Sequence, residues 1–258
     1  KIIIIVFMYE CGRDHMIICE IGLNHMGNSK YANEYVDKII KSKADGILFH
    51  IREREFYEIH PELLLPDKFY VNAINKIKKH NIKFGISIAD PDKVNFCEKI
   101  GVDFYKIFSR DIIDNQILTK IIFTKKRTFV STGMSDFKEI KKFMGMIKNK
   151  NKYFTLIHTQ LDNKIEKVNL KAILALKEKF KMNIGYGNHA SNLFSIYVSV
   201  AYEPSDILFY VKGNKMKKHI DEPHAVELDN LKKFIENIRE CEKAIGSKTK
   251  IKMKGNIN

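Results

Sequence analysis

The residues best suited to chemistry stand where apolar runs of the sequence end. In the stretch IICEIGLNHMG, at 17–27, an apolar run gives way to Glu20, Asn24, His25 and two glycines. This pattern is typical of a buried strand that delivers polar groups to a strand-to-helix loop. Because α/β barrels keep their chemistry in such loops, we expect the functional site at this end of the strands.

Other apolar runs end in the same way, and together they indicate an anion-binding site beside a histidine and a carboxylate. Lys106, Ser109 and Ser131 offer ammonium and hydroxyl donors for such an anion. Each residue alone could cap a loop or lie on the surface, but their occurrence at one rim favours a ligand site. The polar residues expected at this rim are Glu20, His50, Ser87, Asp90, Lys106, Ser109, Ser131, Thr132, His158, His189 and Lys212.

The elements that must position these residues follow from an alternation of short β-branched runs with longer segments of helical period. We predict strands at 16–21, 46–50, 83–88, 103–107, 127–131, 153–158, 182–186 and 206–211. We predict helices near 29–42, 67–80, 91–99, 114–122, 136–149, 168–180, 191–202 and 226–244. Connections of this length join parallel strands, so the α/β class and a single-domain (β/α)8 TIM barrel are the economical architecture. The alternative, an open doubly wound sheet, would normally carry a G-x-G-x-x-G loop, and the sequence has none.

The barrel is expected to occupy 16–246. Residues 1–15 read as an N-terminal strand or hairpin, and 247–258 form a basic tail. The longest non-repeating connection, 51–66, is rich in charge. We expect it to lie over the mouth of the barrel as a lid or substrate loop.

The positive charge of the chain could suggest nucleic acid or an anionic substrate, but it is better explained as a general bias of composition. The formal net charge is +14, but the lysines are spread along the whole sequence on the outer faces of the predicted helices. No recognised nucleic-acid-binding module accompanies them, so we expect no nucleic acid partner.

Membrane spans and disulfides are not expected either. No apolar run approaches the ~20 residues that cross a bilayer, and the stretch 2–8 is short for a signal-peptide core. The four cysteines lie far apart without a C-x-x-C pair, which argues against a zinc ribbon or a disulfide framework. These features indicate a cytoplasmic protein without membrane contact.

Several motifs in a fixed order give the chain a resemblance to the sialic acid synthase family, the NeuB-type synthases. The matching stretches are IICEIGLNHMG at 17–27, DFYKIFSRDI at 103–112, VSTGMSDFKEI at 130–140, TLIHT at 155–159, VNLKAI at 168–173, IGYGNH at 184–189 and the closing stretch 221–231. The resemblance covers nearly the whole chain. It implies a TIM barrel that condenses phosphoenolpyruvate with an N-acylated hexose such as N-acetylmannosamine. The products are nonulosonic acids, and a divalent ion, Mn²⁺ or Mg²⁺, assists.

The resemblance also implies roles for residues of this chain. Glu20, Lys106 and Asp221 are expected to be catalytic, with Lys106, Ser109 and Ser131 in the phosphoenolpyruvate pocket. Glu20 matches a sugar-side carboxylate, Asp221 a late acidic residue near the sugar, and His189 one of two metal-binding histidines. Within or beside these motifs, further substrate-binding residues are expected at Asn24, Thr132 and Asn188.

Departures from the family fall on the same site. A phosphate-binding lysine of the second strand corresponds to Leu48, and by sequence alignment Phe209 and Val211 stand where the family has a carboxylate and the second metal histidine. His50 or His158 could complete a metal site with His189. The family's C-terminal antifreeze-like domain has no counterpart in this sequence.

Two hypotheses follow. The first is a shortened, divergent phosphoenolpyruvate-dependent synthase for surface carbohydrate. The second is a catalytically degenerate barrel that binds a ligand or a partner protein. For either, the expected assemblies are a homodimer or a complex with a partner that supplies an antifreeze-like domain.

Overall fold

A computed structural model of the chain describes residues 15–148, 150–215, 218–250 and 252. The expected strand or hairpin at 1–15 lies outside these ranges except for its last residue, as does most of the end of the basic tail. The described start of that tail, 247–250, is exposed and forms no helix or strand.

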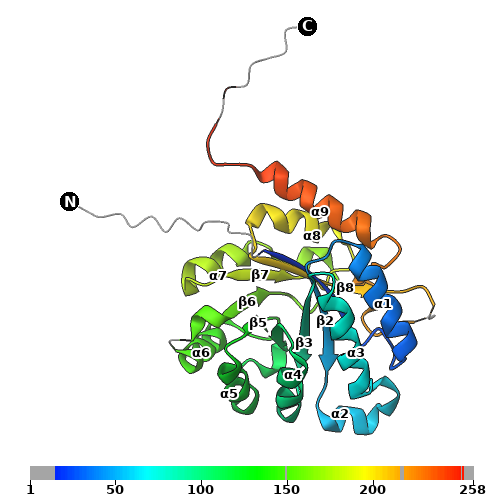
Figure 1. Cartoon of the computed structure of the whole chain (residues 1–258). Coiled ribbons are helices and arrows are strands. Elements are labelled where there is room, and N and C mark those ends of the chain that lie inside the picture. The colour runs from blue at the N-terminus through cyan, green and yellow to red at the C-terminus, as the bar shows by residue number, and fades with distance from the viewer. Residues whose placement is uncertain (1–14, 149, 216–217, 251, 253–258) are drawn as a thin grey trace.

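Eight parallel strands close into a barrel, because the first strand pairs with both the second and the eighth (Figure 1). All eight predicted strands are confirmed, with small differences at their ends, and so is the predicted (β/α)8 fold. Each apolar run is short and β-branched, as suits strands that are buried on both faces. The strands are β1 (Met16–Gly22), β2 (Gly46–Ile51), β3 (Lys83–Ile88), β4 (Phe104–Ile107), β5 (Arg127–Ser131), β6 (Phe154–His158), β7 (Ile184–Gly187) and β8 (Asp206–Lys212).

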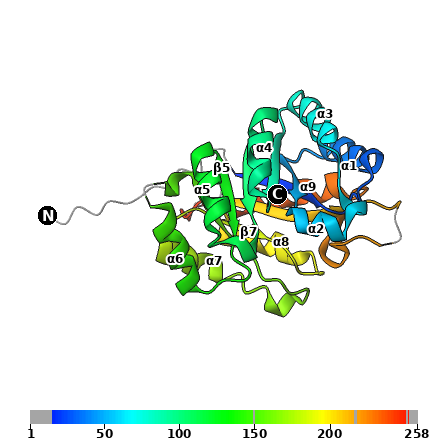
Figure 2. The same cartoon turned by 90° about the horizontal axis from the view of Figure 1, so that it is seen from below.

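Helices connect successive strands and surround the barrel, as the two perpendicular views show (Figures 1 and 2). Their apolar stripes face the strands and their charged faces point outward, which is the pattern that predicted them. They are α1 (Ser29–Lys41), α2 (Arg54–Ile59), α3 (Asp67–Lys78), α4 (Val94–Ile100), α5 (Asn115–Thr124), α6 (Phe137–Ile147), α7 (Ala172–Phe180), α8 (Phe194–Ser199) and α9 (Leu231–Ile245).

Two connections differ from the prediction. The segment 51–66, expected to be irregular, contains the short helix α2 and a 3-10 turn. The helix predicted at 226–244 begins only at Leu231, because Val226 and Glu227 form a short strand, β9, beside the end of β8. Backbone hydrogen bonds to β8 hold these two residues extended, and side-chain periodicity carries no signal of such pairing.

The barrel interior is filled in layers by side chains that alternate along each strand. Gly85 makes room for one of these side chains, since a Cβ on Gly85 would lie 2.1 Å from the ring of Phe104. One layer of inward side chains is apolar. Two positions further along β1, β2, β4, β5 and β8, the inward side chains are polar: Glu20, His50, Lys106, Ser131 and Tyr210. The apolar layer therefore forms the floor beneath these polar residues, at the end of the barrel where the strands end. That layer comprises Ile18, Leu48, Phe104, Phe129, Ile157 and Leu208.

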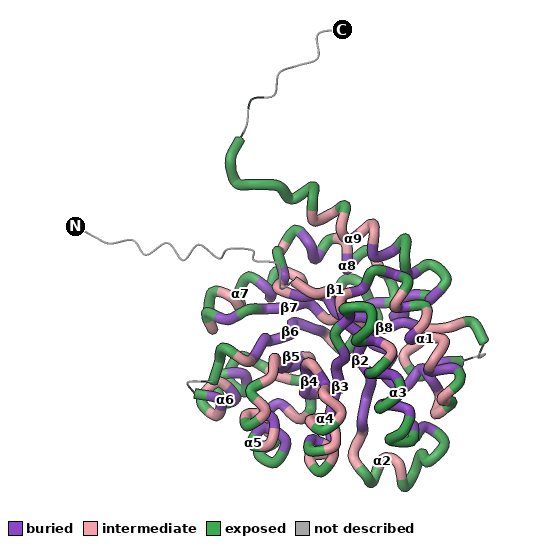
Figure 3. The backbone as a smooth tube through the Cα atoms, viewed as in Figure 1, coloured by how far each residue is buried: buried purple, intermediate pink, exposed green. Residues whose placement is uncertain are grey.

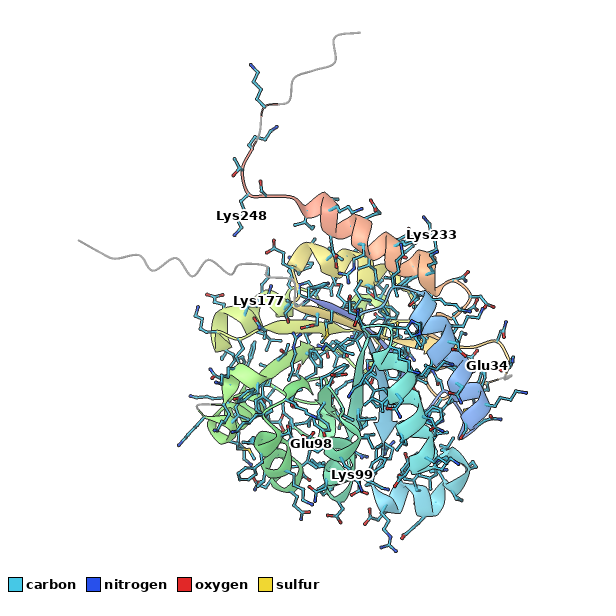
Figure 4. The ribbon with its side chains drawn as sticks, viewed as in Figure 1. Glu34, Glu98, Lys99, Lys177, Lys233 and Lys248 are labelled. Carbon is cyan, nitrogen blue, oxygen red and sulfur yellow. The ribbon has the colours of Figure 1, made fainter. Side chains whose placement is uncertain are left out.

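A second, larger core lies between the strands and the helices. Figure 3 shows buried backbone along the strands and exposed backbone on the outer helices. The charged side chains labelled in Figure 4, of both signs, lie around the outside of the molecule on α1, α4, α7, α9 and the segment after α9. In the described part of the chain, no helix combines the length and apolar character needed to span a membrane.

Candidate active site at the mouth of the barrel

Three polar side chains meet at the mouth, which we define as the end of the barrel formed by the carboxyl ends of the strands. The two carboxylate oxygens of Glu20, on β1, lie 2.5 and 2.7 Å from Nζ of Lys106, on β4. Nε2 of His50, on β2, lies 2.8 Å from Oε1 of the same carboxylate. All three side chains are buried. The fold therefore brings together three of the residues predicted for this rim.

The charge of Glu20 is stabilised by these neighbours. Burial alone would raise the pKa of Glu20, but the Lys106 ammonium and the His50 hydrogen bond outweigh it and lower that pKa. Burial lowers the pKa of His50 although Glu20 opposes this effect. The arrangement is a buried carboxylate–ammonium pair with a polarisable imidazole beside it.

Asp221 approaches the same cluster from the loop after β8. A Cβ on Gly22 would lie 3.0 Å from Oδ2 of Asp221, so this carboxyl packs against the end of β1. Burial and the charge of Glu20 raise the pKa of Asp221 to about 7, against the lowering effect of Lys106. A carboxyl with this pKa can donate or accept a proton near neutral pH.

Tyr210 lines the mouth from β8, and the sequence analysis did not identify it. Its ring centroid lies 5.8 Å from Nζ of Lys106 and 5.9 Å from the ring of His50. Burial and the nearby carboxylates of Glu20 and Asp221 raise the pKa of Tyr210, so its hydroxyl stays protonated and can donate a hydrogen bond.

A pair of hydroxyls lies at the ends of β4 and β5. Oγ of Ser109 donates to Oγ of Ser131 over 2.8 Å and accepts from the backbone N–H of Gly133 over 3.2 Å. On the neighbouring strand β3, Ser87 is paired in register with Lys106. Its hydroxyl is fully buried and has no hydrogen-bond partner among the described residues. These hydroxyls are donors of the kind that an anion needs.

Arg52 adds a positive charge that the sequence analysis missed. Its guanidinium pairs with Glu53 and lies 4.0 Å from the ring centroid of Phe56, and its charge lowers the pKa of Asp221 slightly, against the larger effects of burial and Glu20. Glu53 also accepts from Arg110 over 2.6 Å, so the 51–66 connection is tied to the loop after β4. In Figure 1 this connection, with α2, follows the end of β2, and its role as a lid or substrate loop over the mouth stays a prediction.

Two histidines face each other next to this cluster. The ring centroids of His189, after β7, and His224, after β8, lie 4.6 Å apart. Tyr210 contacts both rings, at 5.5 and 5.0 Å. Burial and the neighbouring cations lower the pKa of His189 to about 3 and that of His224 to about 4, so both rings are neutral at physiological pH.

The donor atoms of these two rings are of a kind that binds divalent ions. Neutral imidazole is a common metal ligand, and both ring nitrogens of His224 are without a hydrogen-bond partner within the described ranges. No group of three or more His, Cys, Asp or Glu side chains in those ranges is arranged to hold a metal by itself. Water or substrate oxygens would have to complete the coordination.

Three predicted substrate-binding residues also use their polar groups on the protein itself. The side chain of Asn24 donates to Val211 O over 2.9 Å and accepts from the backbone N–H of Asp221 over 3.0 Å. Asn188 accepts from Tyr186 and Ser195 and donates to a backbone carbonyl. The hydroxyl of Thr132 donates to Ile157 O over 2.9 Å. These contacts fix the three side chains in place, and their binding of substrate stays a prediction.

His158 does not reach the mouth. Its Nε2 lies 2.9 Å from Val168 O and its ring stacks on Tyr186, while the preceding residue, Ile157, points into the barrel. The proposed completion of a metal site by His158 is therefore corrected. His50 does face the mouth, but its Nε2 is engaged by Glu20.

The sequence alignment put Phe209 and Val211 of β8 at site positions of the family, and this assignment also needs a correction. Phe209 packs outward against Phe234 of α9 with ring centroids 5.3 Å apart, and Val211 belongs to the same outer core. The inward residues are Leu208 and Tyr210, so the alignment that set Phe209 and Val211 at site positions is one residue out of step with the pleat. Leu48, by contrast, does point inward and lies in the floor of the mouth.

The remaining predicted rim residues make local contacts. Asp90 accepts from the backbone N–H of Asp92 over 2.8 Å. His25 is fully buried and its Nδ1 accepts from the N–H of Gly27 over 2.9 Å. Nζ of Lys212 lies 3.2 Å from Oε1 of Glu222.

A closed barrel of eight parallel strands, with helices between the strands, defines the class of TIM barrels. Within that class, the chain belongs to the NeuB family, whose model matches residues 28–250. The resemblance and the fold inferred from the motifs are thereby confirmed.

Similar proteins include named synthases. A N,N'-diacetyllegionaminic acid synthase of Campylobacter jejuni is 28% identical, and the match covers 90% of this chain and 77% of the relative. An uncharacterised protein of Methanocaldococcus jannaschii is 30% identical, with 94% and 75% covered. The crystal structure of an N-acetylneuraminic acid synthetase of Leptospira borgpetersenii, in complex with citrate, superposes with a TM-score of 0.84 at 25% identity, covering 93% and 87% of the two chains. These relatives support a function of the sialic acid synthase type.

Proposed function

We propose that the chain condenses phosphoenolpyruvate with an N-acylated hexose to give a nonulosonic acid. The observation that carries this proposal is the buried Glu20–Lys106 pair at the mouth, with hydroxyl donors on one side and Asp221 on the other. The relatives that match over about nine-tenths of this chain include legionaminic acid and pseudaminic acid synthases, which supports the reaction class.

The phosphate and carboxylate of phosphoenolpyruvate would bind on the Lys106 side of the mouth. An ammonium has three donors, and Glu20 engages it through two contacts, so a ligand anion can take up the remaining capacity. Ser109 and Ser131 lie at the adjoining strand ends, and Arg52 adds positive charge from the opposite loop. Charge-assisted hydrogen bonds of this kind orient an anion as well as hold it.

The condensation requires proton transfers, which we assign to Asp221 and Glu20. Carbon three of phosphoenolpyruvate forms a bond to the aldehyde carbon of the open-chain sugar, whose oxygen gains a proton. Asp221 can supply that proton because its pKa is about 7. Water then adds to carbon two and phosphate leaves, and the Glu20 carboxylate can accept the proton that the water loses.

A divalent ion would polarise the sugar aldehyde as a Lewis acid. His189 would hold such an ion, and its neutral ring beside Tyr210 supports this role.

One observation favours the degenerate barrel as a second candidate. Leu48 fills an inward position where the family has a phosphate-binding lysine, and losing such a charge weakens phosphate binding. Arg52 could compensate from the following loop.

The proposed reaction is tested by incubating the protein with phosphoenolpyruvate, Mn²⁺ and a panel of N-acylated hexoses. We expect release of inorganic phosphate together with a new nonulosonic acid detected by mass spectrometry. If the protein binds phosphoenolpyruvate saturably but no acceptor gives phosphate release, the binding-protein candidate replaces the synthase.

A further inference from the structure

Two arginines from different loops converge on the carboxylate of Glu53. Nε and Nη2 of Arg52, directly after β2, each lie 3.1 Å from an oxygen of Glu53. Nη2 of Arg110, in the 3-10 turn after β4, lies 2.6 Å from Oε2 of the same carboxylate. One carboxylate is therefore held by two guanidinium groups, in the way that such groups hold an anionic ligand.

The two guanidinium groups are oriented by other contacts as well. The guanidinium of Arg52 lies 4.0 Å from the ring centroid of Phe56 and 5.8 Å from that of Phe108. That of Arg110 lies 5.9 Å from the Phe108 ring, and its Nε lies 3.3 Å from Oδ1 of Asp111. Contacts of a guanidinium with aromatic rings and carboxylates hold it in place. The arrangement therefore suits a second anion that takes the place of the carboxylate.

Phe108 connects the two arginines to the polar residues of the mouth. Its ring centroid lies 4.9 Å from that of His50, which faces the mouth. Ser109, the residue before Arg110, shares a hydrogen bond with Ser131 at the ends of β4 and β5. The arginines therefore adjoin the side of the mouth to which we assign the phosphate of phosphoenolpyruvate.

A doubly charged phosphate needs more positive charge than Lys106 supplies. Lys106 contacts both carboxylate oxygens of Glu20, so these two charges largely cancel. Leu48 fills the inward position at which sequence alignment expects a phosphate-binding lysine. A phosphate monoester carries a charge of about −1.5 to −2 at pH 7. Two guanidinium groups beside the hydroxyl pair can balance this charge.

Glu53 is open to exchange with another anion. Its side chain is 28% exposed and that of Arg110 is 41% exposed, and ion pairs that water reaches contribute little stability. Burial raises the pKa of Glu53, but hydrogen bonds from Arg52 and Arg110 outweigh it and lower that pKa to about 2. The carboxylate is therefore ionised at physiological pH and competes with any anion for the same donors.

We propose that Glu53 takes the place of the substrate phosphate in the unliganded protein, and that the phosphate of phosphoenolpyruvate displaces it to bind across Arg52 and Arg110. This inference rests on the proposed function and deepens it. Glu53 is also the residue before α2, so the exchange releases the start of the 51–66 connection from the loop after β4. Phosphate binding is in this way coupled to the position of that connection.

The test is calorimetric titration of the full chain with phosphoenolpyruvate, repeated with inorganic phosphate alone. We expect Arg52→Gln and Arg110→Gln each to weaken the binding of both anions at least about 10-fold, because each variant loses a charged hydrogen-bond donor. We expect Glu53→Gln to bind both anions at least about 3-fold more tightly, because it removes the competing carboxylate.

Arg54→Gln and Glu58→Gln are the matched controls. These two residues form an exposed ion pair within α2, so the variants remove the same charges from the same connection. Their affinities for both anions should stay within about 2-fold of the wild type. Tighter binding by Glu53→Gln but not by Glu58→Gln separates the loss of a competitor from a general change in charge.

Circular dichroism checks that each variant is folded, and Arg110→Gln, at the more exposed arginine, decides if Arg52→Gln does not fold. The exchange is overturned by unchanged affinity in folded Arg110→Gln, by unchanged or weaker binding in Glu53→Gln, or by a wild type that binds neither anion. No titration contains an acceptor sugar. Phosphate release with an acceptor is measured separately, so the condensation can stand while this inference fails.

Discussion

Glu20 is a carboxylate buried at the mouth, and its ionised state depends on two neighbouring side chains. Lys106 contributes two short contacts and His50 a third. A buried ion pair adds little net stability compared with apolar residues, but removing one partner leaves an uncompensated charge. The pair is therefore better explained by a role in binding than by a role in folding.

Glu20→Gln and Lys106→Met should each lower the free energy of unfolding by about 3–5 kcal/mol, because each leaves one charge buried alone. The double variant should lose less unfolding free energy than the sum of the losses in the two single variants, and urea unfolding measures each loss. The control is Lys38→Met with Asp229→Asn, a pair that is about half exposed, for which we expect about 0–1 kcal/mol. Equal, small losses at both pairs would contradict the structure of the mouth.

Asp221→Asn should change how stability depends on pH. Folding raises the pKa of Asp221 from 3.8 to about 7, so the native state holds this proton more tightly and its stability falls as pH rises between these values. The variant lacks this proton, so its stability does not fall in this way. Its unfolding free energy relative to that of the wild type should therefore be higher at about pH 8 than at about pH 5. The gain is about 3 kcal/mol, since about two pH units separate pH 5 from the native pKa of about 7 and each is worth about 1.4 kcal/mol.

The readout is the difference between the unfolding free energies of the two proteins at each pH. Asp229→Asn, an exposed aspartate after β9, serves as the control. An Asp221→Asn difference that is the same at both pH values would show that this carboxyl is not buried beside Glu20.

At the scale of elements, loops rather than strands decide what the mouth can do. Arg52, Asp221, His189 and His224 all lie on loops after strands. The loop after β1 packs against the 51–66 connection, because a Cβ on Gly27 would lie 1.8 Å from Glu62 O. Gly27 also has a φ of +68°, which disfavours any other residue.

Gly27→Ala should therefore destabilise the protein by at least about 1–2 kcal/mol, the usual cost of a left-handed conformation, with a further cost from the clash. Gly145→Ala is the matched control: Gly145 lies within α6, no atom lies within 4 Å of its added Cβ, and alanine there should stabilise by about 0.5–1 kcal/mol. Thermal unfolding of both variants would check this, and equal effects at the two glycines would contradict the packing of the 51–66 connection against the loop after β1.

Strand alternation could have identified one more site residue from the sequence. Along β8, Leu208 and Tyr210 share one face and Phe209 and Val211 share the other. Glu20 of β1 faces inward and pairs in register with Tyr210, so knowing this register would have identified Tyr210 as an inward residue. The sequence alignment was shifted by one residue and therefore assigned Phe209 and Val211 to the inward face. His224 gave no signal, because its position depends on a turn that periodicity does not describe.

At the scale of the whole molecule, the fold was predictable because eight strand–helix repeats leave few ways to bury their apolar faces. Most of the polar residues at the strand ends were predictable for the same reason. The internal hydrogen bonds of Asn24, Asn188 and His158 were not predictable, because the sequence of a motif does not tell whether an amide or imidazole bonds to a backbone carbonyl.

The most direct test of the proposed site is calorimetric titration of phosphoenolpyruvate into Mn²⁺-loaded protein. Glu20→Gln with Lys106→Met is the comparison, since this double variant removes the anion site without leaving a lone buried charge. The account predicts saturable binding by the wild type and at least about 10-fold weaker binding by the double variant, because a buried charge contact to an anion is worth about 2–5 kcal/mol. No binding by the folded wild type, or equal binding by both proteins, would contradict it.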